Sequence, residues 1–316
     1  MERILDELKG AKSIGISGHI RPDGDCVGSC MAMYLYLKKA MPEGTEIDVI
    51  LEPISDIFRC IKDTDEIKEY PRRQAYDVFI VQDTTPDRLG NAYPGYEKAK
   101  KTVNIDHHIS NKGICDVNYI YPDASSASEL VYGLLDKEYV DEEIAKAIYI
   151  GIIHDTGVMQ YSNTNPETLR TLADLISYGF DFPKIIDETF YEKTYAQNLI
   201  LGRALTESML LLDKRCIASC ISKKTMDFYG ITGKDMDGVV NQLRNTKGVE
   251  VAILAYELEA LKWKVSLRSN GLVDVAKVCE FFGGGGHVRA AGCNISGDYH
   301  DVLNNLADRI VLQLDK

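Results

Sequence analysis

The chain has 316 residues, of which 45% are apolar and 27% are charged. This composition is typical of a globular protein, and the length suffices for about two domains of roughly 150 residues each. It excludes a disordered chain, a collagen or a coiled coil as the main architecture. The longest apolar runs, such as residues 147–153, are far shorter than the ~18–20 residues that span a bilayer. The acidic start lacks the basic region of a signal peptide, so we expect a cytoplasmic protein that contacts no membrane.

The eight cysteines form no C-x-x-C pair and lie mostly in apolar runs. This pattern favours reduced cytosolic thiols over a disulfide framework. The formal net charge is −12, so the phosphates of a long duplex would repel the chain. A nucleic-acid ligand should therefore be short or held at one local site. An acidic balance is equally expected of a protein that gathers carboxylates around cations.

The first half of the chain alternates short apolar strands with helices. The sequence predicts strands at residues 13–17, 47–51, 78–81 and 102–105, and helices over 24–39, 125–135 and 142–153. Strands separated by helices predict crossover connections and a parallel sheet, which makes the fold class α/β. In such sheets the ligand site lies beyond the carboxyl ends of the strands, so polar residues directly after a predicted strand are the candidates.

The second half has a different pattern. After a mostly helical stretch come three runs that predict antiparallel strands, at 216–222, 249–256 and 263–268, and helices at 273–281 and 299–312. We therefore predict a parallel-sheet domain of residues 1–190, a helical linker of residues 191–214, and a smaller α+β domain of residues 215–316.

Aspartate follows four of the predicted elements, and three of these segments also carry histidine. The segments are GHIRPDGD at 18–25, Asp83 after VFIVQ, Asp106-His107-His108 after TVNI, and His154-Asp155 after AIYIGII. Four of the six histidines in the chain lie in these clusters, which chance scattering does not explain.

Imidazole nitrogens and carboxylates together form a ligand set for divalent cations of intermediate hardness. Such sites suit Mn²⁺, with Fe²⁺, Co²⁺ and Zn²⁺ as alternatives. One tetrahedral ion would use three or four of these side chains, and the candidates are more numerous, so two ions sharing a bridging carboxylate fit better. Two cations ~3.5–4 Å apart stabilise the attacking and leaving oxygens of an in-line phosphoryl displacement. We therefore predict phosphoester chemistry.

The structural alternatives for these residues are helix caps and core histidines. A single aspartate after a strand is usually an N-cap or turn residue, and we interpret Asp87 in this way. Asp23 and Asp25, two residues apart, are interpreted as ligands. His154 follows an apolar helix, so we interpret it as a core residue or a neighbour of the ligand Asp155.

Four consecutive glycines at 283–286 are followed by His287 and Arg289. Glycine permits positive φ and lets backbone N–H groups approach a ligand closely. Such nests, particularly where a helix begins, bind phosphate or carboxylate oxygens. A glycine run alone is more often a flexible loop, but the adjacent basic side chains favour a phosphate site.

Taken together, these residues resemble the DHH–DHHA1 phosphoesterase family. The pattern H-x-x-P-D-x-D spans residues 19–25, Asp-His-His is 106–108, and GGGGHVRAAG at 283–292 is similar to the DHHA1 signature. The motifs occur in order over nearly the whole chain. With SSASE at 125–129 and SLRS at 266–269, the chain is most similar to the nanoRNase branch, whose members act as oligoribonucleases and pAp phosphatases. Other relatives cleave cyclic dinucleotides or the linear product pApA.

The resemblance implies two divalent ions, with Mn²⁺ the first choice. It assigns one ion to His19, Asp23 and Asp83, and the other to Asp25, Asp83, His107 and Asp155, with Asp83 bridging. It implies catalytic roles for Asp106 and His108, the latter by orienting the nucleophile or contacting phosphate. It places the contacts to a phosphate or terminal nucleotide at Arg88, Arg268, Gly284, Gly285, Gly286 and His287.

We therefore predict a metal-dependent phosphoesterase that hydrolyses short oligonucleotides, linear dinucleotides such as pApA, or pAp. The alternatives are a cyclic-dinucleotide phosphodiesterase, a soluble inorganic pyrophosphatase, and a nucleotide-binding regulator without activity. The glycine–histidine motif argues against the pyrophosphatase, and a regulator would be expected to lack a ligand. Expected partners are short single-stranded RNA or DNA, or small nucleotides, with no long duplex; a homodimer is left open.

Overall fold

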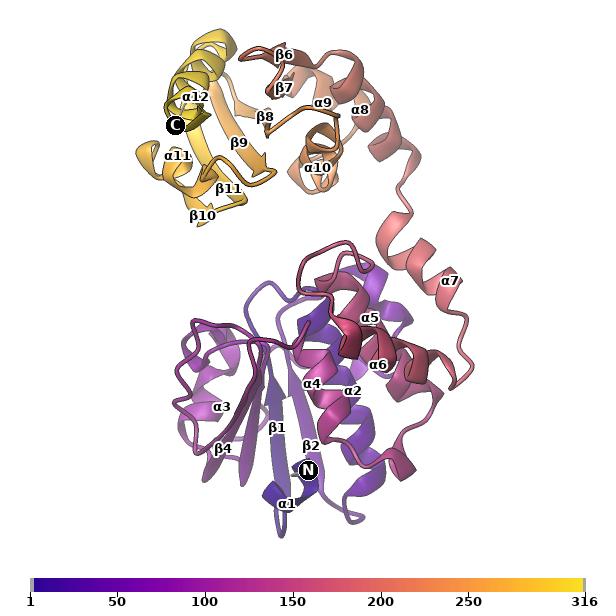
Figure 1. Cartoon of the computed structure of the whole chain (residues 1–316). Coiled ribbons are helices and arrows are strands. Elements are labelled where there is room, and N and C mark those ends of the chain that lie inside the picture. The colour runs from indigo at the N-terminus through magenta and orange to yellow at the C-terminus, as the bar shows by residue number, and fades with distance from the viewer. Residues whose placement is uncertain (1–2, 315–316) are drawn as a thin grey trace. The chain divides into compact units, whose positions relative to one another are not determined.

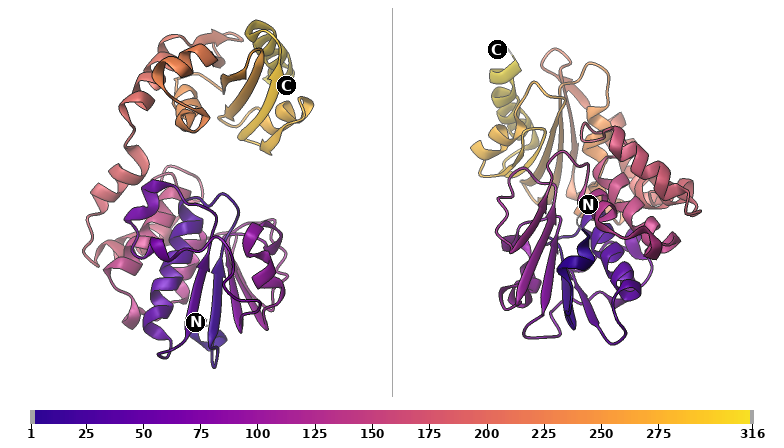
Figure 2. Two further views of the ribbon diagram at one scale, coloured as in Figure 1. Left: turned by 180° about the vertical axis from the view of Figure 1, so that it is seen from behind. Right: turned by 60° about the horizontal axis from the view of Figure 1, so that its bottom comes forward.

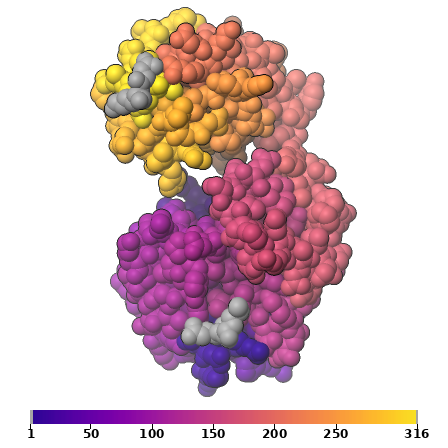
Figure 3. Space-filling model, viewed as in Figure 1, coloured from indigo at the N-terminus to yellow at the C-terminus, as the bar shows by residue number. Residues whose placement is uncertain are grey.

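The computed structural model describes residues 3–314 and divides the chain into two units, Met1–Glu192 and Lys193–Lys316. Each unit contains one sheet with helices packed on it (Figures 1 and 2), and Figure 3 shows one face of both units as a space-filling view. Among the helices of the described residues, none has the length and apolar character needed to cross a membrane.

The first unit is built on a five-stranded parallel sheet in the order β2-β1-β3-β4-β5. The strands are β1 (Ser13–Ser17), β2 (Glu46–Ile50), β3 (Val78–Gln82), β4 (Lys101–Asp106) and β5 (Val117–Ile120). Strands β1 and β3 are buried along their whole length, which explains their continuous apolar sequence. The α/β class and parallel sheet predicted from the sequence are confirmed. The edge strand β5 escapes sequence prediction because it is short and only one of its residues is buried.

The helices of the first unit lie mainly on one face of this sheet (Figure 1). They are α2 (Gly24–Ala40), α4 (Ala127–Leu134), α5 (Glu142–Asp155) and α6 (Pro166–Ile176). The short helices are α1 (Ile4–Glu7), α3 (Tyr93–Glu97) and α7 (Phe182–Ile186), and a π-helical turn follows at Asp187–Tyr191. Two of the long helices, α2 and α5, carry residues of the candidate site at their ends.

Glycines allow α2 and α5 to cross in close contact. A Cβ atom added to Gly28 would lie 2.6 Å from the carbonyl oxygen of Ala147 and 2.8 Å from the backbone nitrogen of Gly151. A Cβ added to Gly151 would meet the Ser128 hydroxyl and lie 3.0 Å from Asp25 Oδ1. The crossing thus sets the distance between the start of α2 and the end of α5.

The second unit has a six-stranded sheet in the order β10-β11-β9-β8-β7-β6. The strands are β6 (Met209–Leu211), β7 (Cys216–Ile221), β8 (Val251–Glu259), β9 (Lys262–Ser269), β10 (Gly285–His287) and β11 (Ala290–Ser296). The predicted antiparallel arrangement is wrong for β7 and β8, which are parallel. The reason is that α9 (Lys223–Tyr229) and α10 (Val239–Arg244) form a crossover that returns the chain to the same end of the sheet.

Both faces of this second sheet are covered. Alternate residues of β7 and β8 enter two separate apolar clusters, as the two-residue period of a strand requires. One cluster includes α8 (Tyr195–Thr206), α9 and α10, and the other includes α11 (Val275–Phe281) and α12 (Tyr299–Leu314). The stretch predicted as a helical linker, 191–214, holds α8 and β6, and both lie within the second unit.

We expect Gly28→Ala to destabilise the protein by about 1–3 kcal/mol, because the added methyl group meets rigid backbone atoms of α5. Gly133→Ala is the matched control, since Gly133 is an exposed residue of α4 with open space at its Cβ position. That change should stabilise the helix by about 1 kcal/mol. Urea unfolding followed by circular dichroism measures both, and equal effects of the two changes would contradict the close crossing.

Candidate metal centre

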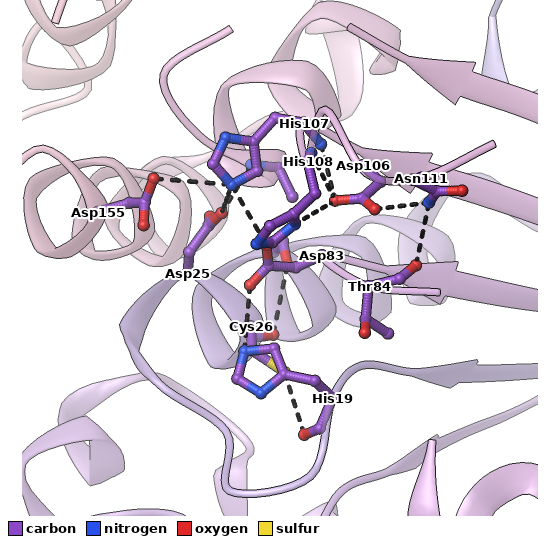
Figure 4. Close-up of polar contacts among 12 residues, drawn as sticks. His19, Asp25, Cys26, Asp83, Thr84, Asp106, His107, His108, Asn111 and Asp155 are labelled. Carbon is purple, nitrogen blue, oxygen red and sulfur yellow. Dashed lines mark hydrogen bonds and ion pairs between the residues drawn. The ribbon is translucent and has the colours of Figure 1, made fainter. Parts of the chain in front are cut away.

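The predicted ligands meet beyond the carboxyl edge of the parallel sheet (Figure 4). Strands β1, β3 and β4 are neighbours in this sheet, so the loops that follow them adjoin. The first turn of α2 and the last residue of α5 reach the same place. The side chains that these five segments bring together are His19, Asp23, Asp25, Asp83, His107, His108 and Asp155.

Asp83 is the centre of this arrangement. Its Oδ2 lies 3.4 Å from His19 Nε2 and its Oδ1 lies 3.5 Å from His107 Nε2, so each oxygen faces a different histidine. The residue is buried and has a φ of 56°, in the left-handed region. A non-glycine residue in that conformation costs on the order of 1–3 kcal/mol, and such strain clusters at functional sites.

The ligand atoms form three overlapping groups: His19, Asp23 and Asp83; Asp25, His107 and Asp155; and Asp83, His107 and His108. Within each group the candidate atoms lie within 4.8 Å of one another. Nitrogen and oxygen ligands bind such cations at about 2.0–2.2 Å, so two atoms on opposite sides of one ion are about 4–4.4 Å apart. The donor chemistry and the spacing therefore fit divalent cations, and these carboxylate and imidazole groups could hold metal.

Asp25 is held in place by the first turn of α4. Its Oδ2 accepts a hydrogen bond from the backbone N–H of Ala127 at 2.6 Å, and its Oδ1 accepts one from Ser128 at 2.8 Å. The side chain of Ser126 caps the same helix by accepting from the N–H of Glu129. The SSASE motif thus builds a helix N-terminus against a buried carboxylate, where the helix dipole favours negative charge.

Asp23 combines the two roles that we weighed for aspartates after a strand. It is the N-cap of α2, because its Oδ1 accepts hydrogen bonds from the N–H groups of Asp25 and Cys26 at 3.1 Å. The same oxygen lies 3.5 Å from His19 Nε2. A carboxylate oxygen has more than one lone pair, so capping and metal binding are compatible.

The close approach of three carboxylates changes the proton affinity of the site. Burial, followed by the charges of Asp83 and Asp155, raises the pKa of Asp25 well above its ordinary value. Burial by itself would lower the pKa of His19, but hydrogen bonds to Asp23 and Asp83 outweigh it and raise this pKa to about 11. For His107, burial is likewise outweighed by Asp83 and Asp25, and the pKa is raised.

Asp106 lies beside the cluster but outside the three groups. Its Oδ1 accepts hydrogen bonds from the N–H of His107 at 2.8 Å and from His108 Nδ1 at 2.7 Å, and its Oδ2 accepts from Asn111 at 2.6 Å. The hydrogen bonds of His108 and Asn111 outweigh burial and lower the pKa of Asp106. These hydrogen bonds fix the ring of His108 beside Asp106, and the catalytic role predicted for Asp106 stays a prediction.

Three asparagines near these carboxylates are not predicted from the sequence as residues of the site. Asn104 lies in β4, fully buried, and donates to the carbonyl oxygens of Val81 and Thr84. Asn111 links Asn104 to Asp106, and Asn163 reaches Asp155. A polar residue inside the apolar run of a strand is the one signal that could have indicated Asn104.

His154 packs behind Asp155 and is absent from the three groups found among the described residues. Its Nε2 is 3.1 Å from the hydroxyl of Thr189, and its ring contacts those of Phe58 and Phe190 with centroids 5.0 and 5.5 Å away. The side chain is half-buried, which fits a neighbour of Asp155 better than a core residue.

Arg88 lies in a short 3-10 turn, Pro86–Arg88, just after Asp83. Its carbonyl oxygen accepts a hydrogen bond from Ile20 at 2.9 Å, which ties this turn to the loop that follows His19. The residue is exposed, so the turn presents its side chain to solvent beside the cluster. The proposed contact with substrate stays a prediction.

Two of the residues predicted to bind substrate in the second unit, Arg268 and His287, share one row of the sheet. Ala290 of β11 pairs with Arg268 of β9 on one side and with His287 of β10 on the other. Residues in register point to the same face of the sheet, and the backbones of strands two positions apart are about 10 Å from each other. The row therefore places a guanidinium and an imidazole on one face. Arg268 Nε donates to Asn241 at 3.1 Å, which fixes the guanidinium.

The glycine run does not begin a helix. It follows α11 and forms the edge strand β10. A Cβ at Gly284 would lie 2.3 Å from the carbonyl oxygen of Gly292, and one at Gly286 would lie 2.5 Å from that of Ala290, so close packing against β11 requires glycine at both. Gly285 has open space at its Cβ position instead, and its proposed contact with a ligand stays a prediction.

Two family matches cover most of the chain. Residues 13–152 match the DHH family, N-terminal domain, and residues 214–313 match the DHHA1 domain. Among curated relatives, the bifunctional oligoribonuclease and PAP phosphatase NrnA of Thermus thermophilus is 27% identical over 94% of this chain and 89% of its own. The protein of the same name from Bacillus subtilis is 28% identical over 94% and 92%.

Solved structures share the fold. An exopolyphosphatase-related protein from Bacteroides fragilis superposes with a TM-score of 0.85 at 24% identity, over 97% of this chain and 94% of that chain. RecJ of Thermus thermophilus, solved in complex with Mn²⁺, has a TM-score of 0.55 at 12% identity, over 99% of this chain and 54% of that chain.

We expect Mn²⁺ binding to release protons and to tighten as the pH rises from about 6 to about 8. In the metal-free protein the raised pKa values keep His19 and His107 protonated at neutral pH, and a cation binds only the neutral imidazole. Calorimetric titration in buffers of different ionisation enthalpy counts the protons. His19→Gln should reduce the count, whereas His300→Gln, on the surface of the second unit, should not. Binding without proton release contradicts the assigned ligands.

Proposed function

This chain belongs to the DHH–DHHA1 family of phosphoesterases, and on that premise we propose that it hydrolyses short oligonucleotides and pAp with two divalent cations. The curated relatives named oligoribonuclease and PAP phosphatase align with nearly all of the chain, which supports this substrate class. The observation that carries the proposal is the Asp83 carboxylate, whose two oxygens face His19 and His107 of two different ligand groups.

We assign one cation to His19, Asp23 and Asp83, and the other to Asp25, Asp83, His107 and Asp155. Mn²⁺ is the preferred ion because the donor set mixes imidazole nitrogen with carboxylate oxygen. When bound, the cations lower the pKa of a water molecule and neutralise charge on the phosphoryl oxygens. The residues themselves fix the positions of these charges before substrate arrives, which is the basis of electrostatic stabilisation.

In this proposal, His108 donates a proton from its Nε2 atom. Its Nδ1 is bonded to Asp106 Oδ1 at 2.7 Å, and this contact raises the pKa of His108. The side chain is 43% exposed, so Nε2 is available to a ligand. A protonated His108 donates Nε2–H to a phosphoryl oxygen or to the leaving oxygen, and Asp106 keeps the ring in the orientation for this transfer.

In this proposal, the second unit binds one end of the substrate. Arg268 and His287 lie in one row of its sheet, and a guanidinium binds phosphate by paired hydrogen bonds. A short substrate agrees with the net charge of −12, which would repel a long duplex. The exclusion of long duplexes and the cytoplasmic location stay predictions, and a homodimer is left open.

The first test is activity with Mn²⁺ on pApA, a short oligoribonucleotide, pAp, cyclic di-AMP and pyrophosphate. Asp83→Ala should reduce kcat by about 10³-fold or more, corresponding to ~4 kcal/mol of transition-state stabilisation. Asp87→Ala, a change at an exposed aspartate four residues later, should leave kcat unchanged. Intact pApA, oligoribonucleotide and pAp would contradict the proposal, and pyrophosphate cleavage alone would favour a pyrophosphatase. Nucleotide binding without any turnover would favour the regulator.

The second test concerns the row formed by Arg268 and His287. His287→Ala should raise KM for pApA by about 10- to 100-fold, since a hydrogen bond to a charged group contributes about 1.5–3 kcal/mol. The effect on kcat should be smaller, because the residue lies in a different unit from the ligand groups. His300→Ala in the same unit is the control. A fall in kcat with constant KM would contradict a role in substrate binding.

A further inference from the structure

The segment after α5 turns back sharply toward the metal centre. Helix α5 ends at Asp155, and the next residues Gly157, Val158 and Met159 have φ values of 56°, 53° and 65°. Three successive left-handed residues reverse the direction of the chain. The turn is held by the N–H of Val158, which donates to Ile153 O at 2.7 Å, and by that of Met159, which donates to the Thr156 hydroxyl.

This turn brings Asn163 back against the residue that ends the helix. Its Nδ2 donates to Asp155 Oδ2 at 3.2 Å, to the backbone oxygen of Asp155 at 3.1 Å, and to the backbone oxygen of Ser125 at 2.8 Å. Because all three neighbours are acceptors, only the NH₂ group of the amide can face them. The orientation of this side chain is therefore determined by its surroundings.

The hydrogen bond from Asn163 has no substitute at Asp155. Within residues 3–314, it is the only hydrogen bond made by the Asp155 carboxylate; His107 Nε2 lies 3.7 Å away. Asp25 of the same ligand group is held differently, by two backbone N–H groups and near-complete burial. Asp155 has a side chain that is 29% exposed, so it has more rotational freedom to lose when it binds a cation.

Asn163 also joins the two carboxylates of that group through the backbone. Ser125, whose carbonyl oxygen it binds, begins the segment in which Ala127 and Ser128 donate to Asp25. One amide thus ties the end of α5 to the start of α4. Any shift of this contact would move Asp155 relative to Asp25.

We propose that Asn163 is a positioning residue of the metal centre, which holds the Asp155 carboxylate in its ligand orientation and fixes the spacing of Asp155 and Asp25. This inference rests on the proposed assignment of Asp25, His107 and Asp155 to one cation. Neutral partners that orient a ligand typically contribute 10- to 100-fold to metal affinity. The amide does so without adding a positive charge that would compete with the cation.

The test is calorimetric titration of the metal-free full chain with Mn²⁺. Asn163→Ala should weaken binding of one of the two ions by about 10- to 100-fold, and excess Mn²⁺ should restore kcat. Asn165→Ala is a matched control, because Asn165 caps α6 through Glu167 and Thr168 and donates to Asp123. It should lower thermal stability and leave Mn²⁺ affinity unchanged.

A double-mutant cycle with Asp155→Ala separates positioning from general structural damage. If Asn163 acts through Asp155, adding Asn163→Ala to Asp155→Ala should not weaken Mn²⁺ binding further. Independent losses that add in the double variant would overturn the inference, and so would an unchanged affinity in Asn163→Ala. A parent protein that binds no Mn²⁺ would instead contradict the metal centre itself.

Discussion

The central physical constraint in this structure is the repulsion among three closely spaced carboxylates, two of them buried. Asp25, Asp83 and Asp155 all lie within reach of His107, and in a region of low dielectric such charges repel strongly. The pKa values of Asp25, His19 and His107 are raised because bound protons reduce the negative charge of the cluster. Divalent cations meet the same need better, because they deliver two charges each and are not limited to one ligand atom. The attraction for a cation would therefore exist before any substrate binds.

The fold provides the rigidity that this repulsion demands. Three adjacent parallel strands end at the cluster, and β1 and β3 are buried throughout, so the loops that follow them start from fixed points. On the helical side, the close crossing at Gly28 and Gly151 sets how far Asp25 can lie from the end of α5. Gly24 contributes in the same way, since a Cβ there would meet the ring of His154 at 2.4 Å. Glycine is thus used where helix ends must approach, and the carboxylates cannot relax apart without breaking that packing.

Local pattern and short motifs predict much of this from the sequence. The strands β1, β3 and β4 are found within a residue or two of their apolar runs, and the residues directly after them are the ones that converge. The tertiary arrangement of crossovers and loops is not predicted from the sequence. The parallel pairing of β7 and β8 depends on an intervening pair of helices rather than on the strands themselves. Asn111 and Asn163 are ordinary loop residues by composition, and only the tertiary contacts with Asp106 and Asp155 give them a role. These asparagines follow their partners by only five and eight residues, and the sequence does not reveal how the loop between them folds back.

The donors that hold these carboxylates are mostly neutral, and this has a physical reason. Asp25 is held by backbone N–H groups, and the carboxylates of Asp106 and Asp155 accept from side-chain amides. A lysine or arginine in any of these places would orient the carboxylate equally well. Its positive charge, however, would neutralise part of the negative charge of the site and reduce the attraction for a cation. Histidine is the exception that the chemistry permits, because its proton leaves when a metal arrives. Neutral donors therefore orient the ligands while preserving the negative field, and the same choice explains why asparagine, and not a basic residue, lies against Asp155.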